Sequence, residues 1–273
     1  PGPQSREIAS LGFSHAERIM SRLQDKAAII TGGAGGIGIA AANKFVAEGA
    51  KVLLVDLDQA VLADAARELG HAAAWCVADV SKPEGAQSYV QAATEAFGGV
   101  DILVANAGIE GQVKPIVDQD VEMFDKVIAV NVRGVWLGLK YAIPAIATRG
   151  GGAIVITSSV AGIHGSPGAS PYVTRKHAVV GMMRSAALEC APLNIRVNTV
   201  NPSPVETRMM RSLEEGMMPG AAASAHDSIA HRIPLGRYGE PDDVANLMCF
   251  LASNEAEFLT GGVSLGHGAI PAA

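Results

Sequence analysis

Thr31-Gly32-Gly33-Ala34-Gly35-Gly36-Ile37-Gly38 stands between a short apolar run at 27–31 and a helical stretch at 37–48. Glycines there permit a tight turn and let backbone N–H groups approach a pyrophosphate, while the helix N-terminus adds unpaired donors and positive dipole charge. A glycine cluster alone also fits an ordinary turn. The strand before it, the helix after it and an acidic residue about 20 positions later favour a dinucleotide site. The residues predicted to contact the cofactor here are Gly32, Gly36, Ile37 and Gly38.

That acidic residue is Asp56, which ends the apolar run 51–56. A carboxylate at this place can accept hydrogen bonds from the adenosine ribose hydroxyls, and it would repel the extra phosphate of NADP. No Lys or Arg lies in the glycine loop or directly after Asp56. The sequence therefore predicts NAD as the cofactor, with a solvated strand-end aspartate as the alternative.

Outward from this loop, strand and helix patterns alternate along the chain. Further strands are predicted at 73–77, 102–105, 153–157, 196–200 and 263–265, and helices at 58–69, 82–97, 119–148, 172–190 and 241–252. This alternation predicts an α/β fold, a single Rossmann-like doubly wound parallel sheet with helices on both faces. The predicted domain covers 21–273, with an irregular substrate lid at about 203–235. Residues 1–20, which begin Pro-Gly-Pro, are predicted to be a leader or tag, either disordered or a short helix.

The composition and charge of the chain exclude several classes of binding partner. The net charge is −6 and no basic stripe is present, which argues against nucleic acid. No apolar run approaches the ~18 residues of a membrane span, so we expect no membrane partner. The three cysteines lack CxxC spacing, which predicts neither a disulfide framework nor a metal site. We expect a cytoplasmic protein acting on a small molecule.

Tyr172 and Lys176 are four residues apart in a helical pattern, so they share one helix face. A free phenol has a pKa of ~10, and a nearby ammonium or the positive charge of oxidised nicotinamide favours the phenolate. Tyr172 can then take a proton from an alcohol or give one to a ketone. Lys176 can also bond the nicotinamide ribose hydroxyls. The YxxxK spacing alone occurs by chance in many helices.

Other residues near Tyr172 and Lys176 in the predicted site could also take part in the reaction. Ser159 follows the strand 153–157, where its hydroxyl could bond the substrate oxygen or only stabilise a turn. Asn131 lies inside the helical stretch 119–148, either as an exposed amide or holding a water that relays protons to Lys176. Arg175 and His177 are expected to face away from Lys176, because adjacent helix residues point apart.

Two strand ends supply further cofactor candidates. Asp79-Val80 follows the strand 73–77, and Asp79 could bond the adenine amino group or cap the helix near Pro83. Asn106-Ala107-Gly108 follows the strand 102–105, where ligands collect at the carboxyl ends of parallel strands. An ordinary Asn/Gly turn is the alternative there.

Taken together, these motifs resemble the short-chain dehydrogenase/reductase family from about Leu23 to Gly268. The resemblance implies a catalytic tetrad of Asn131, Ser159, Tyr172 and Lys176. The segment 201–207 resembles the one that holds the nicotinamide carboxamide, which implicates Pro202, Val205 and Thr207. The stretches 236–241 and 250–253 match late family landmarks. The resemblance further implies a homotetramer, with helices 119–148 and 172–190 forming its interfaces.

The chain departs from the usual family pattern at several positions. Ala105 stands where a second Asn is common, Ser203 replaces a frequent Gly, and Gly266-His267-Gly268-Ala269 replaces a common Val-Asp-Gly-Gly. The last change puts C-terminal packing, and with it the usual assembly, in doubt.

The substrate is the least determined feature. The stretches 106–111 and 124–127 look similar to NAD-dependent dehydrogenases of cyclic alcohols, so we expect a compact apolar secondary alcohol or its ketone. The methionines of the lid either adapt to such a ligand or pack the lid on the core: Met209, Met210, Met217 and Met218. The alternative functions are an NADPH-dependent 3-oxoacyl-thioester reductase and a non-catalytic nucleotide-binding scaffold.

Overall fold

The structure is a computed structural model that describes residues 21–266 and 268. The predicted leader at 1–20 and the positions 267 and 269 of the unusual ending lie outside the described residues.

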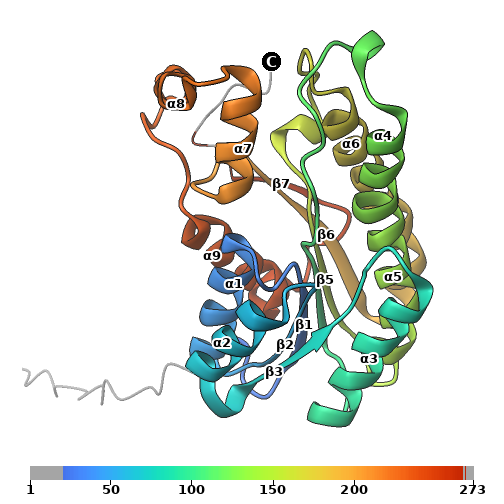
Figure 1. Cartoon of the computed structure of the whole chain (residues 1–273). Helices are drawn as coiled ribbons and strands as arrows, with labels where there is room; N and C mark the ends of the chain where they lie inside the picture. Colours follow the sequence, from blue (N-terminus) through green and yellow to red (C-terminus); the bar gives the residue numbers. More distant parts are fainter. Residues whose placement is uncertain (1–20, 267, 269–273) are drawn as a thin grey trace, which may run out of the picture.

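A parallel sheet of seven strands in the order β3-β2-β1-β4-β5-β6-β7 forms the centre of the molecule (Figure 1). The prediction of a Rossmann-like parallel sheet is confirmed. The inner strands are buried along nearly their whole length, as continuous apolar runs in a sheet covered on both faces are expected to be. The strand order reverses between β1 and β4, and ligands bind at such a switch point. The strands are β1 Ala27–Thr31, β2 Lys51–Asp56, β3 Ala73–Val77, β4 Ile102–Ala105, β5 Gly152–Thr157, β6 Ile195–Pro202 and β7 Val263–Gly266.

Helices cover both faces of this sheet, and each face has its own apolar core. On one side α1 (Gly36–Ala47), α2 (Gln59–Leu69) and α9 (Pro241–Ala252) bury Phe45, Leu62 and Met248. On the other side α3 (Pro83–Phe97), α5 (Gly134–Ala147) and α6 (Ser170–Cys190) bury Tyr89, Leu139 and Met183. Figure 1 shows the two groups of helices on opposite sides of the strands. This arrangement confirms the doubly wound fold.

The predicted helical stretch 119–148 is helical from 121 to 147, and its hydrogen-bond pattern changes in the middle. Helix α4 (Val121–Ile128) ends in a π-helical turn at Ala129–Arg133, and α5 begins at Gly134. Such turns insert an extra residue and are frequent at functional sites. Here the turn contains Asn131, whose side-chain amide bonds the backbone of Ile109 in the loop after β4. The tertiary contact, which no local pattern encodes, accompanies this change in helical hydrogen bonding.

The segment 203–235 contains two helices, although its sequence shows no regular core pattern. They are α7 (Arg208–Met217) and α8 (Ala222–Ala230), and both lie above the carboxyl ends of the strands, across from α4 and α6 (Figure 1). Met217 and Met218 are each 43% exposed, while Met209 and Met210 are half-buried. None of the described helices is both long enough and apolar enough to cross a bilayer.

Candidate active site

The glycine loop between β1 and α1 is shaped for close backbone approach. Gly32 has φ +70°, and a Cβ on Gly38 would lie only 2.1 Å from the Gly32 carbonyl oxygen. Helix α1 begins after Gly35 without a side-chain cap, and both Gly35 and Gly36 are exposed. Uncapped N–H groups at an exposed helix start suit a phosphate group. The loop therefore fits the dinucleotide for which its sequence is typical.

Asp56 lies beside this loop at the end of β2. One carboxylate oxygen accepts a hydrogen bond from Ala34 N at 3.1 Å, and the other accepts one from Leu57 N at 2.7 Å. Within the described residues, no Lys or Arg forms an ion pair with Asp56. Among the described residues, only backbone N–H groups bond this carboxylate. Its remaining lone pairs can accept hydrogen bonds from hydroxyl groups.

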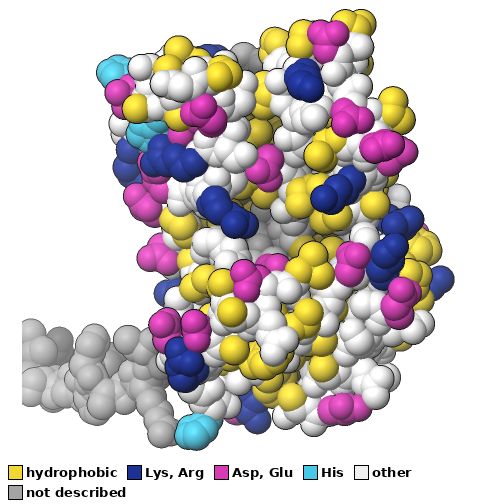
Figure 2. Space-filling view, viewed as in Figure 1, with side chains coloured by type: hydrophobic (Ala, Val, Ile, Leu, Met, Phe, Trp, Pro, Cys, Tyr) yellow, Lys and Arg dark blue, Asp and Glu magenta, His cyan; other side chains and the backbone are white. Residues whose placement is uncertain are grey.

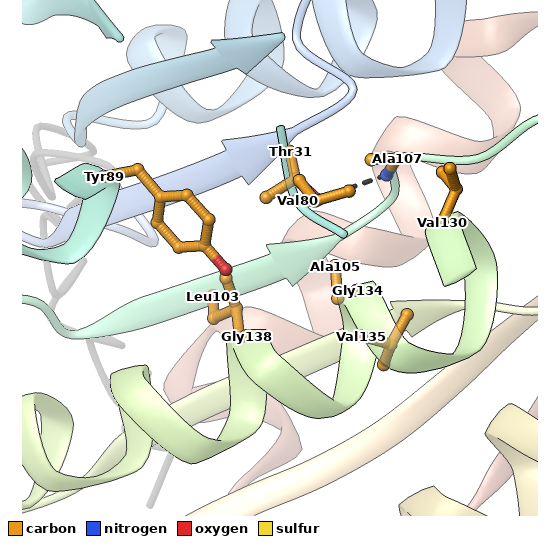
Figure 3. Close-up of a pocket in the computed structure, with 10 residues that line it drawn as sticks. All are labelled: Thr31, Val80, Tyr89, Leu103, Ala105, Ala107, Val130, Gly134, Val135 and Gly138. Atoms are coloured by element: carbon orange, nitrogen blue, oxygen red, sulfur yellow. Dashed lines mark hydrogen bonds between the residues drawn. The ribbon is translucent and has the colours of Figure 1, made fainter. Parts of the chain in front are cut away.

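The turn Asn106-Ala107-Gly108 joins three strand ends. Asn106 donates through Nδ2 to Thr31 O at 3.2 Å and accepts through Oδ1 from Thr157 Oγ1 at 3.1 Å. Ala107 N donates to Thr31 Oγ1 at 3.1 Å, the bond drawn in Figure 3. These bonds fix the carboxyl ends of β1, β4 and β5 to one another, which is more than an ordinary turn would do.

Asp79 does not cap α3. That helix begins after Lys82 without a side-chain cap, and the Asp79 carboxylate instead accepts from Ser81 N at 2.9 Å. Burial acts to raise the pKa of Asp79, but the bonds from Ser81 and the nearby cations Lys82 and Arg133 outweigh it and lower that pKa. Val80, which follows it, is buried against Gly134. Contact of Asp79 and Val80 with adenine stays a prediction.

Tyr172 and Lys176 lie on the same side of the fold, as their spacing predicts. The Lys176 ammonium is 5.8 Å from the Tyr172 ring centroid and donates to Thr157 O at 2.8 Å. Ser158 Oγ donates in turn to Lys176 O at 3.0 Å. Burial, and after it the charge of Arg175, hold the pKa of Lys176 well below its ordinary value. Together these bonds attach the start of α6 to the carboxyl end of β5.

Ser159 is buried between the ends of β5 and β6. Its hydroxyl donates to Pro202 O at 3.4 Å and accepts from Ala161 N at 3.2 Å. Asn201 Nδ2 donates to Ser159 O at 2.8 Å, which ties the same two strand ends together. The hydroxyl is thus kept at the edge of the sheet from which α6 begins.

Asn131 is 3% exposed, so its interpretation as a surface amide is wrong. Its Oδ1 accepts from Ile109 N at 2.8 Å and its Nδ2 donates to Ile109 O at 2.9 Å. A Cβ on Gly108 would lie 2.5 Å from that Oδ1, which explains the glycine there. The amide fixes the loop after β4, and a water relay from Asn131 to Lys176 stays a prediction.

Arg175 and Lys176 both approach the ring of Tyr172, which corrects the expectation that Arg175 faces away from Lys176. Arg175 is only 3% exposed, and its guanidinium carbon lies 4.2 Å from the Tyr172 ring centroid. His177 is exposed, with Nδ1 3.0 Å from Val173 O. Residues three apart share a helix face, so the spacing from Tyr172 to Arg175 predicts the contact between these two side chains.

The predicted nicotinamide segment leads from β6 into α7. Val205 forms a bridge with Gly239, and Gly239 N donates to Pro204 O at 2.9 Å. Thr207 Oγ1 donates to Val205 O at 3.2 Å and accepts from Met210 N at 3.3 Å, so Thr207 caps α7. These contacts hold the segments 201–207 and 236–241 side by side. In Figure 2 the surface is hollowed above the sheet, between α7–α8 and the α4 side.

Comparisons with known proteins agree with this geometry. A family model described as enoyl-(acyl carrier protein) reductase matches residues 32–265. A cyclohexanol dehydrogenase from an Acinetobacter species is 36% identical, over 90% of this chain and 95% of that protein. A levodione reductase from Leifsonia aquatica is 37% identical, over 89% and 93% of the two chains. A crystal structure of levodione reductase superposes with a TM-score of 0.88 at 35% identity, covering 90% of this chain and 98% of that one.

A 3-oxoacyl-acyl-carrier-protein reductase from Thermotoga maritima is also similar, with 37% identity over 89% of this chain and 96% of that protein. The fold, the ordered site and these matches define an oxidoreductase with a dinucleotide-binding sheet. The chain belongs to the short-chain dehydrogenase/reductase family. It is an enzyme of the alcohol dehydrogenase and ketone reductase type.

Proposed function

We propose that this enzyme transfers a hydride between NAD(H) and a compact cyclic secondary alcohol or ketone, with Tyr172 as general acid and base. The observation that carries this proposal is that the Lys176 ammonium lies beside the Tyr172 ring. The same ammonium donates a hydrogen bond to Thr157 O at the carboxyl end of β5. Ser159 follows that same strand, and the glycine loop follows β1 in the same sheet.

Each side chain has a part in this reaction. The bound nicotinamide supplies the position that accepts or releases the hydride. Tyr172 takes the hydroxyl proton during oxidation and returns it to the carbonyl oxygen during reduction. Ser159 donates a hydrogen bond to the oxygen on which charge develops. Lys176 bonds the nicotinamide ribose, while Pro202, Val205 and Thr207 hold the carboxamide.

The preference for NAD is supported by the surroundings of Asp56. Its carboxylate is fixed next to the glycine loop by Ala34 N and Leu57 N. A phosphate on the adenosine ribose would meet this negative charge without a Lys or Arg to offset it. A competing function, reduction of 3-oxoacyl thioesters with NADPH, is favoured by the similarity to the Thermotoga maritima reductase. Tighter binding of NADPH than of NADH in a fluorescence titration would support that alternative and contradict ours.

The substrate class is supported by two relatives, whose names specify cyclohexanol and levodione. The half-buried methionines of α7, Met209 and Met210, are flexible apolar side chains suited to such ligands. A panel of cyclic and open-chain secondary alcohols, read by NADH absorbance, tests this. We expect the cyclic alcohols to have the higher kcat/KM.

We also propose that the enzyme is a cytoplasmic homotetramer. Val121, Trp136 and Leu188 lie on α4, α5 and α6 and are 73%, 49% and 80% exposed in the single chain. Large apolar side chains on adjoining helices suit an interface between subunits. Cys76, Cys190 and Cys249 are all unpaired thiols, which suits a reducing compartment.

The variant Tyr172→Phe tests the catalytic assignment. It removes one hydroxyl and keeps the ring, so we expect turnover to fall about a thousandfold while NADH binding is retained. Tyr141→Phe removes the same group from α5 and serves as the matched control, with turnover close to that of the wild type. Substantial turnover by Tyr172→Phe would show that another group transfers the proton.

A further inference from the structure

Arg175 is a buried cation that the mechanism above does not use. Its guanidinium carbon lies 4.2 Å from the centroid of the Tyr172 ring, and its side chain is almost fully covered. Within the described part of the chain, Nε and Nη2 of Arg175 are buried and have no hydrogen-bond partner. Burying a charge without such partners costs free energy. Its position against the proposed acid/base therefore needs a chemical explanation.

The guanidinium lies between Tyr172 and the loop after β4. An Nη1 of Arg175 lies 3.4 Å from the place that a Cβ on Gly108 would occupy. The same place is 2.5 Å from Asn131 Oδ1, so the missing side chain at 108 leaves room for both groups. Arg175 thus fills the space between the Tyr172 ring and the Gly108–Asn131 contact.

Three charged groups act at this place. Burial is the main influence on Arg175 and lowers its pKa, whereas Tyr172 and the half-buried carboxylate of Glu110 act to raise it. Lys176 approaches the same tyrosine ring at 5.8 Å. Burial and the charge of Arg175 both disfavour the protonated form of Lys176 and lower its pKa.

The two cations therefore differ in how constant their charge is. A guanidinium keeps its proton in proteins, whereas a buried ammonium readily loses its own. A cation over an aromatic face is attracted to it, and the attraction grows when the environment excludes water. It also grows when the phenol becomes a phenolate, because opposite charges then face each other.

We propose that Arg175 is a positioning residue for Tyr172, which holds the ring by stacking and keeps a permanent positive charge beside the phenol during alcohol oxidation. Tyr172 receives the alcohol proton while the hydride leaves the carbinol carbon, and Arg175 neither gains nor loses a proton. The inference rests on the proposed function, because Arg175 acts only through Tyr172.

Three variants at this position test the proposal: Arg175→Met keeps apolar bulk without charge, Arg175→Gln is neutral and polar, and Arg175→Lys supplies a cation that can lose its proton. We expect Arg175→Met to lower kcat at neutral pH about tenfold, with little change in KM for the alcohol. The pH at which oxidation reaches half its maximal rate should move to a more alkaline value. Arg175→Lys should restore part of kcat, and only at pH values at which its buried ammonium keeps its proton, so its pH profile should lie between those of the wild type and the neutral variants.

Arg67→Met is the matched control, because it removes the same charge from an exposed place in the last turn of α2. Thermal unfolding and NADH binding establish that each variant is folded. If Arg175→Met does not fold, Arg175→Gln serves as the neutral variant. An unchanged pH profile in the folded neutral variant would overturn the proposal. An equal loss of kcat in the neutral variants and in Arg175→Lys, without a shift of the pH profile, would also overturn the proposal. That result would mean that Arg175 contributes only through packing.

These results are distinguishable from failure of the proposed function. If Tyr172→Phe is inactive while a neutral Arg175 variant keeps the wild-type profile, only the role of Arg175 is wrong. If Tyr172→Phe remains active, the catalytic assignment itself is wrong and the role of Arg175 is overturned with it.

Discussion

At the residue scale, Asp56 accepts hydrogen bonds from Ala34 N and Leu57 N and keeps a negative charge beside the glycine loop. Replacing Asp56 with Ser removes that charge but keeps an acceptor for the backbone. We expect Asp56→Ser to shift the ratio of kcat/KM for NAD to that for NADP toward NADP by about tenfold or more. Asp58→Ser is the control, because Asp58 is an exposed cap of α2 and serine caps equally well. A ratio unchanged by Asp56→Ser would mean that other groups select the cofactor.

Most residues at the site could be predicted from the sequence, because each stands at a strand end or at a helix spacing with a known direction. Asp56, Ser159 and the Tyr172–Lys176 pair are of this kind. The place of Arg175 follows from its spacing of three residues from Tyr172 and not from the opposite directions of adjacent helix residues. The burial of Asn131 was also beyond local reasoning, since its partner Ile109 is 22 positions away in the chain.

At the element scale, an ion pair joins the chain before β1 to the end of α1. Arg22 donates to Glu48 at 2.6 Å, and Lys44 lies 3.1 Å from the same carboxylate oxygen. The bond from Arg22 is the main cause that lowers the pKa of Glu48 to about 2, against burial, which acts to raise it. A depressed carboxyl pKa stabilises the folded state above the unfolded-state pKa of about 4.5. That stabilisation is lost as the pH falls through 4.5 toward 2.

We therefore expect Glu48→Gln to lower the free energy of unfolding at pH 7, and the difference from wild type to shrink progressively below about pH 4.5. Urea unfolding at a series of pH values measures this. Glu68→Gln changes an exposed carboxylate of α2 that forms no ion pair among the described residues, and it is expected to have little effect. A pH-independent difference for Glu48→Gln would contradict the account of this pair.

Most regular elements were predictable because buried parallel strands are short apolar runs and helices α1, α2 and α3 end at or next to glycines. The lid helices were not, because the buried side of α7 carries a charged side chain as well as half-buried methionines. Glu214 is fully buried in α7 and pairs with Arg211 at 3.0 Å, and Arg211 also pairs with Glu206. A buried glutamate in such a segment looks like a surface residue in the sequence.

At the scale of the whole molecule, the alternation of strands and helices is sufficient to predict the sheet and the layers around it. It does not predict how chains assemble, because an exposed apolar residue reads like a buried one in the sequence. Leu188 on α6 is 80% exposed in the single chain. The structure thus offers a direct way to test the proposed tetramer.

The variant Leu188→Glu places a charge in the proposed interface, where it would be buried without a partner. We expect wild-type protein to have the mass of four chains in light scattering and Leu188→Glu to form smaller species. Leu57→Glu, on a residue after β2 that is 66% exposed, should keep the wild-type mass. A wild-type monomer, or an unchanged mass for Leu188→Glu, would refute the assembly proposed for these helices.

The most direct measurement follows a labelled hydrogen. Cyclohexanol carrying deuterium on its carbinol carbon is incubated with NAD and enzyme, and the reduced cofactor is analysed by mass spectrometry and NMR. Direct hydride transfer at this site predicts that wild-type enzyme places the deuterium on nicotinamide C4 and that Tyr172→Phe, although it binds NADH, transfers almost none. Loss of the label to water, or equal transfer by both proteins, would contradict the account.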